Sequence, residues 1–102
     1  MRKEERTANN QEALRKWEEC IKEFIRISPN SPARLRVCDA LVYYTENFIY
    51  LKSYDTFVAC IDKRTNTLYD MHRYMSGYTI RHSQHIGKFC YDYGAAKIVR
   101  YS

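Results

Sequence analysis

The chain has 102 residues, a length that accommodates one domain with a single modest core, so we expect one domain over residues 1–102. Apolar residues make up 45% of the chain and charged residues 28%, with three Gly and two Pro, which excludes collagen-like, low-complexity and disordered proteins. Lys and Arg outnumber Asp and Glu by 17 to 12, and this positive balance favours an acidic protein surface or nucleic acid as the partner.

Apolar runs are short along the whole chain. None exceeds five residues, whereas a transmembrane helix needs about 20. The first six residues are mostly charged and lack the apolar segment of a secretory signal, so we expect the protein in the cytoplasm. No two of the four cysteines form a C-x-x-C pair, which predicts reduced, buried thiols at Cys20, Cys38, Cys60 and Cys90.

Residues 1–8 are predicted to be a flexible N-terminal tail, followed by an amphipathic helix. Asn9 and Glu12 have the spacing of a capping box, and Pro29 ends the helix after about 19 residues. Apolar side chains recur at steps of three and four, a stripe typical of core packing: Leu14, Trp17, Ile21, Phe24 and Ile25. A helix offered to a partner or to a second copy of the chain is the alternative.

The next part of the chain has the composition of β-strands. Four short runs rich in β-branched and aromatic residues are separated by polar turns. They predict consecutive antiparallel strands, a meander of about four strands. The runs are Ala40–Tyr44, Phe48–Leu51, Thr56–Ile61 and Thr67–Met71.

A second helix and a final short strand complete the predicted fold. Thr79 can cap a helix that continues to Tyr93, where Gly94 suits a left-handed C-terminal position, and Lys97–Tyr101 follows as a strand. Runs of strands without strict alternation of strand and helix indicate an α+β domain. We expect both helices on one face of an antiparallel sheet.

Two short motifs carry a resemblance to other proteins. Ser53-Tyr54-Asp55-Thr56-Phe57-Val58-Ala59 and the stretch from Tyr74 to His82 resemble the S-Y-x-T-x-V-A and Y-S-x-T-x-R-H motifs of a family of small proteins from phages and mobile elements. The resemblance implies a setting in which small phage proteins bind and inhibit a host defence or replication machine. Anti-CRISPR proteins are among them.

Histidine and aspartate side chains are candidates for metal binding or for catalysis. His82 and His85 are three residues apart on the second predicted helix, but a zinc site needs three or four ligands, and no further ligand stands at a diagnostic spacing. His82 paired with Asp70 or Asp92 could serve hydrolysis, yet no complete set of nucleophile, base and orienting group can be assembled. We therefore predict no metal, no cofactor and no catalytic site, and expect His82 to hydrogen-bond the preceding loop.

Ten tyrosines suggest a second kind of function. Strand alternation places Phe48, Tyr50, Lys52 and Tyr54 on one face of their strand, with Ile49, Leu51 and Ser53 on the core face. Tyr50, Lys52 and Tyr54 could then stack the bases of single-stranded nucleic acid. Phosphate contacts would come from Arg64, Arg73, Arg81 and Lys88.

The function that we favour is that of a non-enzymatic binding protein of phage type. We expect it to dock on a host protein or ribonucleoprotein, such as a CRISPR effector, as a monomer or a homodimer. The segment Met71–Arg81 is predicted to be its functional surface because Met, Tyr and Arg side chains dominate interfaces. The predicted partner-binding residues are Arg64, Met71, Arg73, Tyr74, Tyr78, Arg81 and Lys88. Single-stranded nucleic-acid binding is the alternative.

Overall fold

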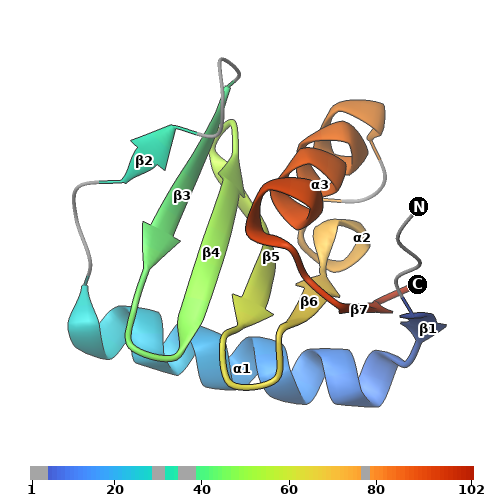
Figure 1. Cartoon of the computed structure of the whole chain (residues 1–102), viewed down its shortest axis with the longest axis horizontal. Coiled ribbons are helices and arrows are strands. Elements are labelled where there is room, and N and C mark those ends of the chain that lie inside the picture. The colour runs from blue at the N-terminus through green and yellow to red at the C-terminus, as the bar shows by residue number, and fades with distance from the viewer. Residues whose placement is uncertain (1–4, 29–31, 35–38, 77–78) are drawn as a thin grey trace.

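The computed structural model describes residues 5–28, 32–34, 39–76 and 79–102 (Figure 1). Two long helices, one short helix and a seven-stranded sheet make up an α+β fold, as the sequence predicts. In chain order the elements are β1 (Glu5–Ala8), α1 (Asn10–Ile27), β2 (Ala33–Arg34), β3 (Ala40–Tyr44), β4 (Phe48–Ser53), β5 (Thr56–Asp62), β6 (Thr67–Asp70), α2 (His72–Met75), α3 (Ile80–Tyr93) and β7 (Lys97–Arg100).

The sheet has the strand order β1-β7-β6-β5-β4-β3-β2. Its centre is the predicted antiparallel meander of β3, β4, β5 and β6. The chain then crosses over through α2 and α3, so that β7 pairs with β6 in parallel, as a crossover connection allows. The short β2 pairs antiparallel with β3 at the far edge.

The expected tail at the N-terminus is corrected by the strand β1. Its residues Glu5–Ala8 pair in parallel with Lys97–Arg100 of β7. Asn9 then donates its backbone N–H to the Arg100 carbonyl at 3.2 Å, and the side chain of Asn10 exchanges two hydrogen bonds with the backbone of Ser102. The start of the described chain is therefore fixed to its end, through a pairing partner that is remote in sequence.

Local capping signals place both long helices where the sequence predicts them. Asn9 Oδ1 accepts the Glu12 N–H at 3.1 Å, and Thr79 Oγ1 accepts the His82 N–H at 3.2 Å. At the C-terminus of α3, Gly94 has the left-handed φ of 66° that glycine adopts without a Cβ clash. The short helix α2 lies inside the segment Met71–Arg81, where the sequence predicts no helix before Thr79.

The two long helices lie on opposite faces of the sheet (Figure 1), not on one face as expected. Both faces of the strands are apolar, so each face must be buried against another element. The α1-side core joins α1 residues to one set of strand residues: Ala13, Trp17 and Cys20 with Phe48, Tyr50, Cys60, Tyr69 and Val99. The α3-side core joins the other set: Ile86, Phe89 and Cys90 with Leu51, Val58, Ile61, Leu68 and Ile98.

A register shift between β4 and β5 affects which side chains reach each core. The pairing slips at Leu51 and Lys52, so that Val58 and Ala59 both join the α3-side core although they are consecutive. The predicted stripe of α1 is also displaced. Ala13, Trp17 and Cys20 form its buried centre, while Ile25 is 69% exposed.

Candidate functional site

Positive charge gathers in the last third of the chain. Residues 71–102 contain five Lys or Arg and one acidic residue, Asp92, so this third carries a net charge of +4 out of the total of +5. It folds into α2, α3 and β7. We call its exposed cations, Arg73, Arg81, Lys88 and Arg100, the basic face.

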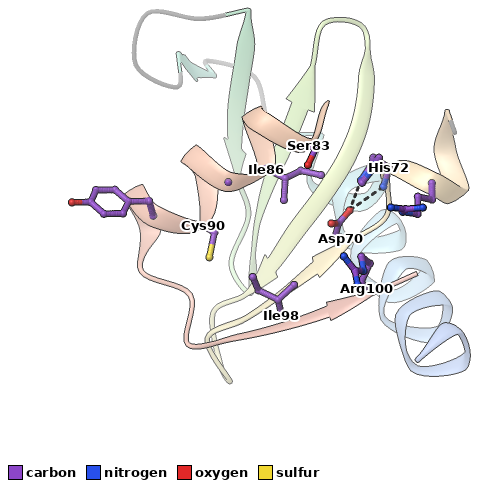
Figure 2. A pocket seen from close by; sticks show the side chains of 10 residues that line it. Asp70, His72, Ser83, Ile86, Cys90, Ile98 and Arg100 are labelled. Atoms are coloured by element: carbon purple, nitrogen blue, oxygen red, sulfur yellow. Dashed lines mark hydrogen bonds and ion pairs between the residues drawn. The ribbon is translucent and has the colours of Figure 1, made fainter. Parts of the chain in front are cut away.

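A pocket of about 230 Å³ opens between β6, α2, α3 and β7 (Figure 2). Its lining combines charged, hydroxyl and apolar groups from elements that are separate in sequence. The lining residues are Asp70, His72, Arg73, Ser83, Ile86, Gly87, Cys90, Tyr91, Ile98 and Arg100. Two cations of the basic face, Arg73 and Arg100, thus share one concave site.

A buried aspartate and histidine form part of the pocket wall. Asp70 ends β6 and His72 begins α2, and the His72 Nδ1 atom lies 2.6 Å from Asp70 Oδ1. A carboxylate can only accept, so Nδ1 carries a proton and donates it to Asp70. His72 is 2% exposed, and this bond fixes the orientation of its ring. Asp70 therefore pairs with His72, where the sequence suggested His82.

His82 and His85 instead meet a buried serine between α3 and β4. Ser53 Oγ lies 2.7 Å from His82 Nδ1 and 2.6 Å from His85 Nδ1. The hydroxyl has one proton to give, so at least one of the two Nδ1 atoms donates to it. Burial lowers the pKa of both imidazoles, and the nearby charges of His72 for His82 and of Lys88 for His85 act in the same direction. The arrangement joins α3 to the sheet through neutral imidazoles.

The structure divides the predicted partner-binding residues into three groups. Arg73, Tyr74, Arg81 and Lys88 are exposed, and the Tyr74 ring packs against that of Tyr101 at an interplanar angle of 60°, with ring centroids 5.1 Å apart. Met71 is fully buried, so that expectation is corrected. Arg64 is 47% exposed and also held in ion pairs, so its role toward a partner stays a prediction. Tyr78 lies outside the described residues.

Arg64 and Met71 have structural roles of a different kind. Arg64 bonds Glu19 Oε2 at 2.7 Å and Asp62 Oδ1 at 3.0 Å, and Lys16 Nζ bonds the same buried Asp62 at 3.0 Å. This ion-pair network joins α1 to the turn after β5. Met71 packs in the α1-side core.

The predicted surface for stacking bases is not present on the described chain, because α1 covers that face. Tyr50 is 2% exposed and donates its hydroxyl to the Cys20 carbonyl at 2.5 Å, and burial raises its pKa. Lys52 lies over the Phe57 ring at 5.5 Å. Tyr54 turns toward the other face, where its ring lies 5.4 Å from that of His85. These three side chains form no common platform.

Several residues of the site were missed by the analysis of the sequence. Arg100 and Tyr91 line the pocket, and Tyr91 is 78% exposed. The charge count of residues 71–102 is a signal that could have directed attention to Arg100. Nothing local in the sequence indicates that β7 returns beside β6 and brings Arg100 to Arg73, because that depends on the crossover.

No protein-family model, no curated protein and no solved structure matches this chain. Within residues 5–28, 32–34, 39–76 and 79–102, no three His, Cys, Asp or Glu side chains are grouped so that they could hold a metal ion. None of the described helices is long and apolar enough to cross a membrane. Three of the predicted thiols, Cys20, Cys60 and Cys90, are buried, and Cys38 lies outside the described residues.

Proposed function

We propose that this protein is a non-enzymatic binding protein that docks its basic face on an acidic surface of a protein partner. The observation that carries the proposal is the net charge of +4 in residues 71–102, where four of the five cations are exposed side chains of α2, α3 and β7. Such a field steers an acidic partner toward this face and selects against basic partners. The resemblance to small phage proteins supports an inhibitory role against a host defence nucleoprotein in the bacterial cytoplasm.

Exposed apolar and aromatic side chains among the cations favour a protein as the partner. Tyr74 is 49% exposed, Ile80 62% and Tyr91 78%, whereas Met75 lines an apolar pocket beside Trp17 on the α1 side. Tyr, Met and Arg are enriched in the centres of protein interfaces, where they provide contact area as well as charge. The face thus combines an attractive field with the side chains that anchor an interface.

Direct nucleic-acid binding is the second candidate. The concentration of Lys and Arg favours it, because phosphate contacts release counterions from the nucleic acid. Tyr50, Lys52 and Tyr54 do not serve this candidate as predicted, since Tyr50 is covered by α1. Any such binding would use the basic face and would weaken steeply with added salt.

A pair of charge reversals tests the proposal. Arg81→Glu with Lys88→Glu changes two exposed residues that lie seven positions apart on α3. Arg15→Glu with Lys22→Glu makes the same charge change at the same spacing on exposed positions of α1 and is the matched control. We expect each pair to leave the free energy of unfolding within about 1 kcal/mol of the parent, since all four side chains are exposed.

The readout is the recovery of a stoichiometric partner from lysate of the host bacterium by the tagged protein. We expect the parent and the α1 pair to recover the same protein after nuclease treatment, and the α3 pair to lose it. Retention by the α3 pair would contradict the proposal. Recovery that depends on nucleic acid, with a gel shift of single-stranded DNA or RNA at about 150 mM salt, would establish the second candidate instead.

A further inference from the structure

Gly87 opens the pocket from the middle of α3. It lies within the helix Ile80–Tyr93, where glycine destabilises the helix relative to alanine. A Cβ atom built at Gly87 meets no heavy atom within 4 Å, so packing does not require the absence of a side chain there. Gly87 does line the pocket. The consequence of the glycine is an unobstructed entrance between α3 and the cations across the pocket.

The groups around this entrance have the chemistry of an oxyanion site. Arg73 and Arg100 supply guanidinium groups, whose planar forks match the oxygens of a phosphoryl group. Ser83 adds a hydroxyl from α3. These donors come from three elements, α2, α3 and β7, all of which contribute to the lining of the pocket.

The charge balance in the pocket favours an anion. Arg73 and Arg100 carry two positive charges and Asp70 one negative charge, which leaves an excess of one positive charge among these three groups. Asp70 Oδ1 is engaged by the His72 Nδ1–H at 2.6 Å and faces the further N–H of the His72 backbone at 3.4 Å. These bonds stabilise the carboxylate locally and reduce its repulsion toward a ligand.

The size of the pocket limits what it can take. Its volume of about 230 Å³ is below the range of about 300–1,000 Å³ that is usual for sites of whole small molecules. A recess of this size accepts a terminal group of a ligand rather than an internal part of a long chain. Ile86 and Ile98 add apolar wall that can contact a carbon skeleton beside the anionic group.

We infer that the pocket between β6, α2, α3 and β7 is a binding site for a terminal phosphoryl group, held by Arg73, Arg100 and Ser83 and admitted past Gly87. The ligand is free phosphate or a phosphomonoester. This site goes beyond the docking proposal, because it binds its ligand with or without a protein partner. Two cations of the basic face, Arg73 and Arg100, line this site, whereas Arg81 and Lys88 do not.

Titration of the ¹⁵N-labelled protein with inorganic phosphate, followed by amide chemical shifts at constant ionic strength, tests the site. The reference titration replaces phosphate by chloride. We expect saturable shifts that are largest at Ser83, Gly87 and Arg100, and no saturation with chloride. A nucleoside 5′-monophosphate should bind at the same residues, and the nucleoside alone should not. This comparison shows whether the phosphoryl group or the nucleoside is recognised.

Three variants separate the pocket from general attraction by positive charge. Arg100→Gln removes a pocket cation, and Gly87→Leu fills the entrance without changing the net charge. Lys88→Gln removes an exposed cation one residue from Gly87 that does not line the pocket, and it is the matched control. We expect the first two to raise the dissociation constant for phosphate about tenfold or more, and Lys88→Gln to change it by less than about twofold.

Equal weakening by Lys88→Gln and Arg100→Gln would overturn the site, as would unchanged phosphate binding in Gly87→Leu or shifts spread evenly over surface lysines such as Lys22 and Lys63. If Gly87→Leu disturbs the fold, Gly87→Ala gives a smaller obstruction in open space, and Arg100→Gln still decides the question. The docking proposal fails or succeeds separately. Arg81→Glu with Lys88→Glu should lose the protein partner while the pocket still saturates with phosphate.

Discussion

At the scale of single residues, the buried carboxylate of Glu23 shows how one side chain joins a helix to a turn. Glu23 on α1 accepts hydrogen bonds from the Thr45 hydroxyl, the Asn47 backbone N–H at 2.9 Å and the Asn47 amide at 2.8 Å. Burial by itself raises the pKa of Glu23, but these hydrogen bonds and nearby Arg26 outweigh it, so the pKa lies below its ordinary value. The charged form is therefore part of the folded structure.

Glu23→Gln should lower the free energy of unfolding by about 1–3 kcal/mol, because an amide NH₂ then faces donors that need an acceptor. The measurement is urea unfolding at pH 7, with Glu18→Gln, an exposed position of the same helix, as the control. The contribution of Glu23 should be present above pH 4.5 and decrease as the pH falls below this value, since the pKa is lowered in the folded state. Equal stability of the two variants at pH 7 would contradict this role.

At the scale of elements, the contact of α3 with β4 depends on two neutral histidines. His82 and His85 share Ser53 Oγ, and the pKa of each is lowered below 6.5 by burial. Lys88, Arg81 and His82 oppose a positive charge on His85, while Asp39 favours one. The unfolded chain therefore binds more protons than the folded chain near pH 6, and acid favours unfolding.

We expect the free energy of unfolding to be highest at pH 7 and above and to decrease as the pH falls from about 7 to 5, by up to about 1.4 kcal/mol per pH unit for each imidazole. His82→Asn and His85→Asn place an amide near the position of Nδ1 without a titrating group, so together they should flatten this dependence. Urea unfolding at several pH values measures it. A dependence that is equally steep in the double variant would show that other groups cause it.

The pairing of β1 with β7 gives a second prediction about elements. If Glu5–Ala8 stabilises the sheet edge as its pairing indicates, a chain that lacks residues 1–8 should lose about 2 kcal/mol of stability through lost backbone hydrogen bonds. Its β7 amides should also exchange faster with solvent. A chain that lacks only residues 1–4 keeps the four paired residues and is the control. Equal stability of all three chains would instead favour the tail that the sequence predicts.

Sequence reasoning succeeded for elements whose signals are local. The caps Asn9 and Thr79, the left-handed Gly94 and the four consecutive strands of the meander depend on neighbouring residues, and they are where the sequence places them. The strand β1 was missed because its partner lies in β7, far along the chain. The predicted exposure of Tyr50 was wrong because it depends on which face of the sheet α1 covers. Both faces of the strands are apolar, so the sequence does not decide between them.

At the scale of the whole molecule, two cores share one sheet. Trp17 belongs to the α1-side core and Ile86 to the α3-side core, and β4, β5, β6 and β7 contribute side chains to both. If these strands unfolded, both cores would lose side chains that they bury. In a domain of this size that coupling favours a single cooperative transition.

Urea unfolding followed by the fluorescence of Trp17, the only tryptophan in the sequence, should therefore coincide with the loss of the folded Ile86 methyl resonance. Both should give one midpoint and one free energy of unfolding. A core-weakening substitution on one side, such as Phe89→Ala on α3, should shift both probes together. Separate midpoints would show that one helix detaches while the other layer remains folded.

The parallel pair of β1 and β7 also determines when folding can finish as the ribosome makes the chain. Residue 5 faces residue 97, so β1 leaves the exit tunnel early and must wait for its neighbour to be translated. At the usual rate of synthesis the wait is roughly 5 to 20 seconds. During that time the nascent edge strand exposes backbone donors and acceptors that chaperones or other nascent chains can engage. The speed of translation between the codons for residues 5 and 97 thus becomes a factor in how much of the product reaches its native state.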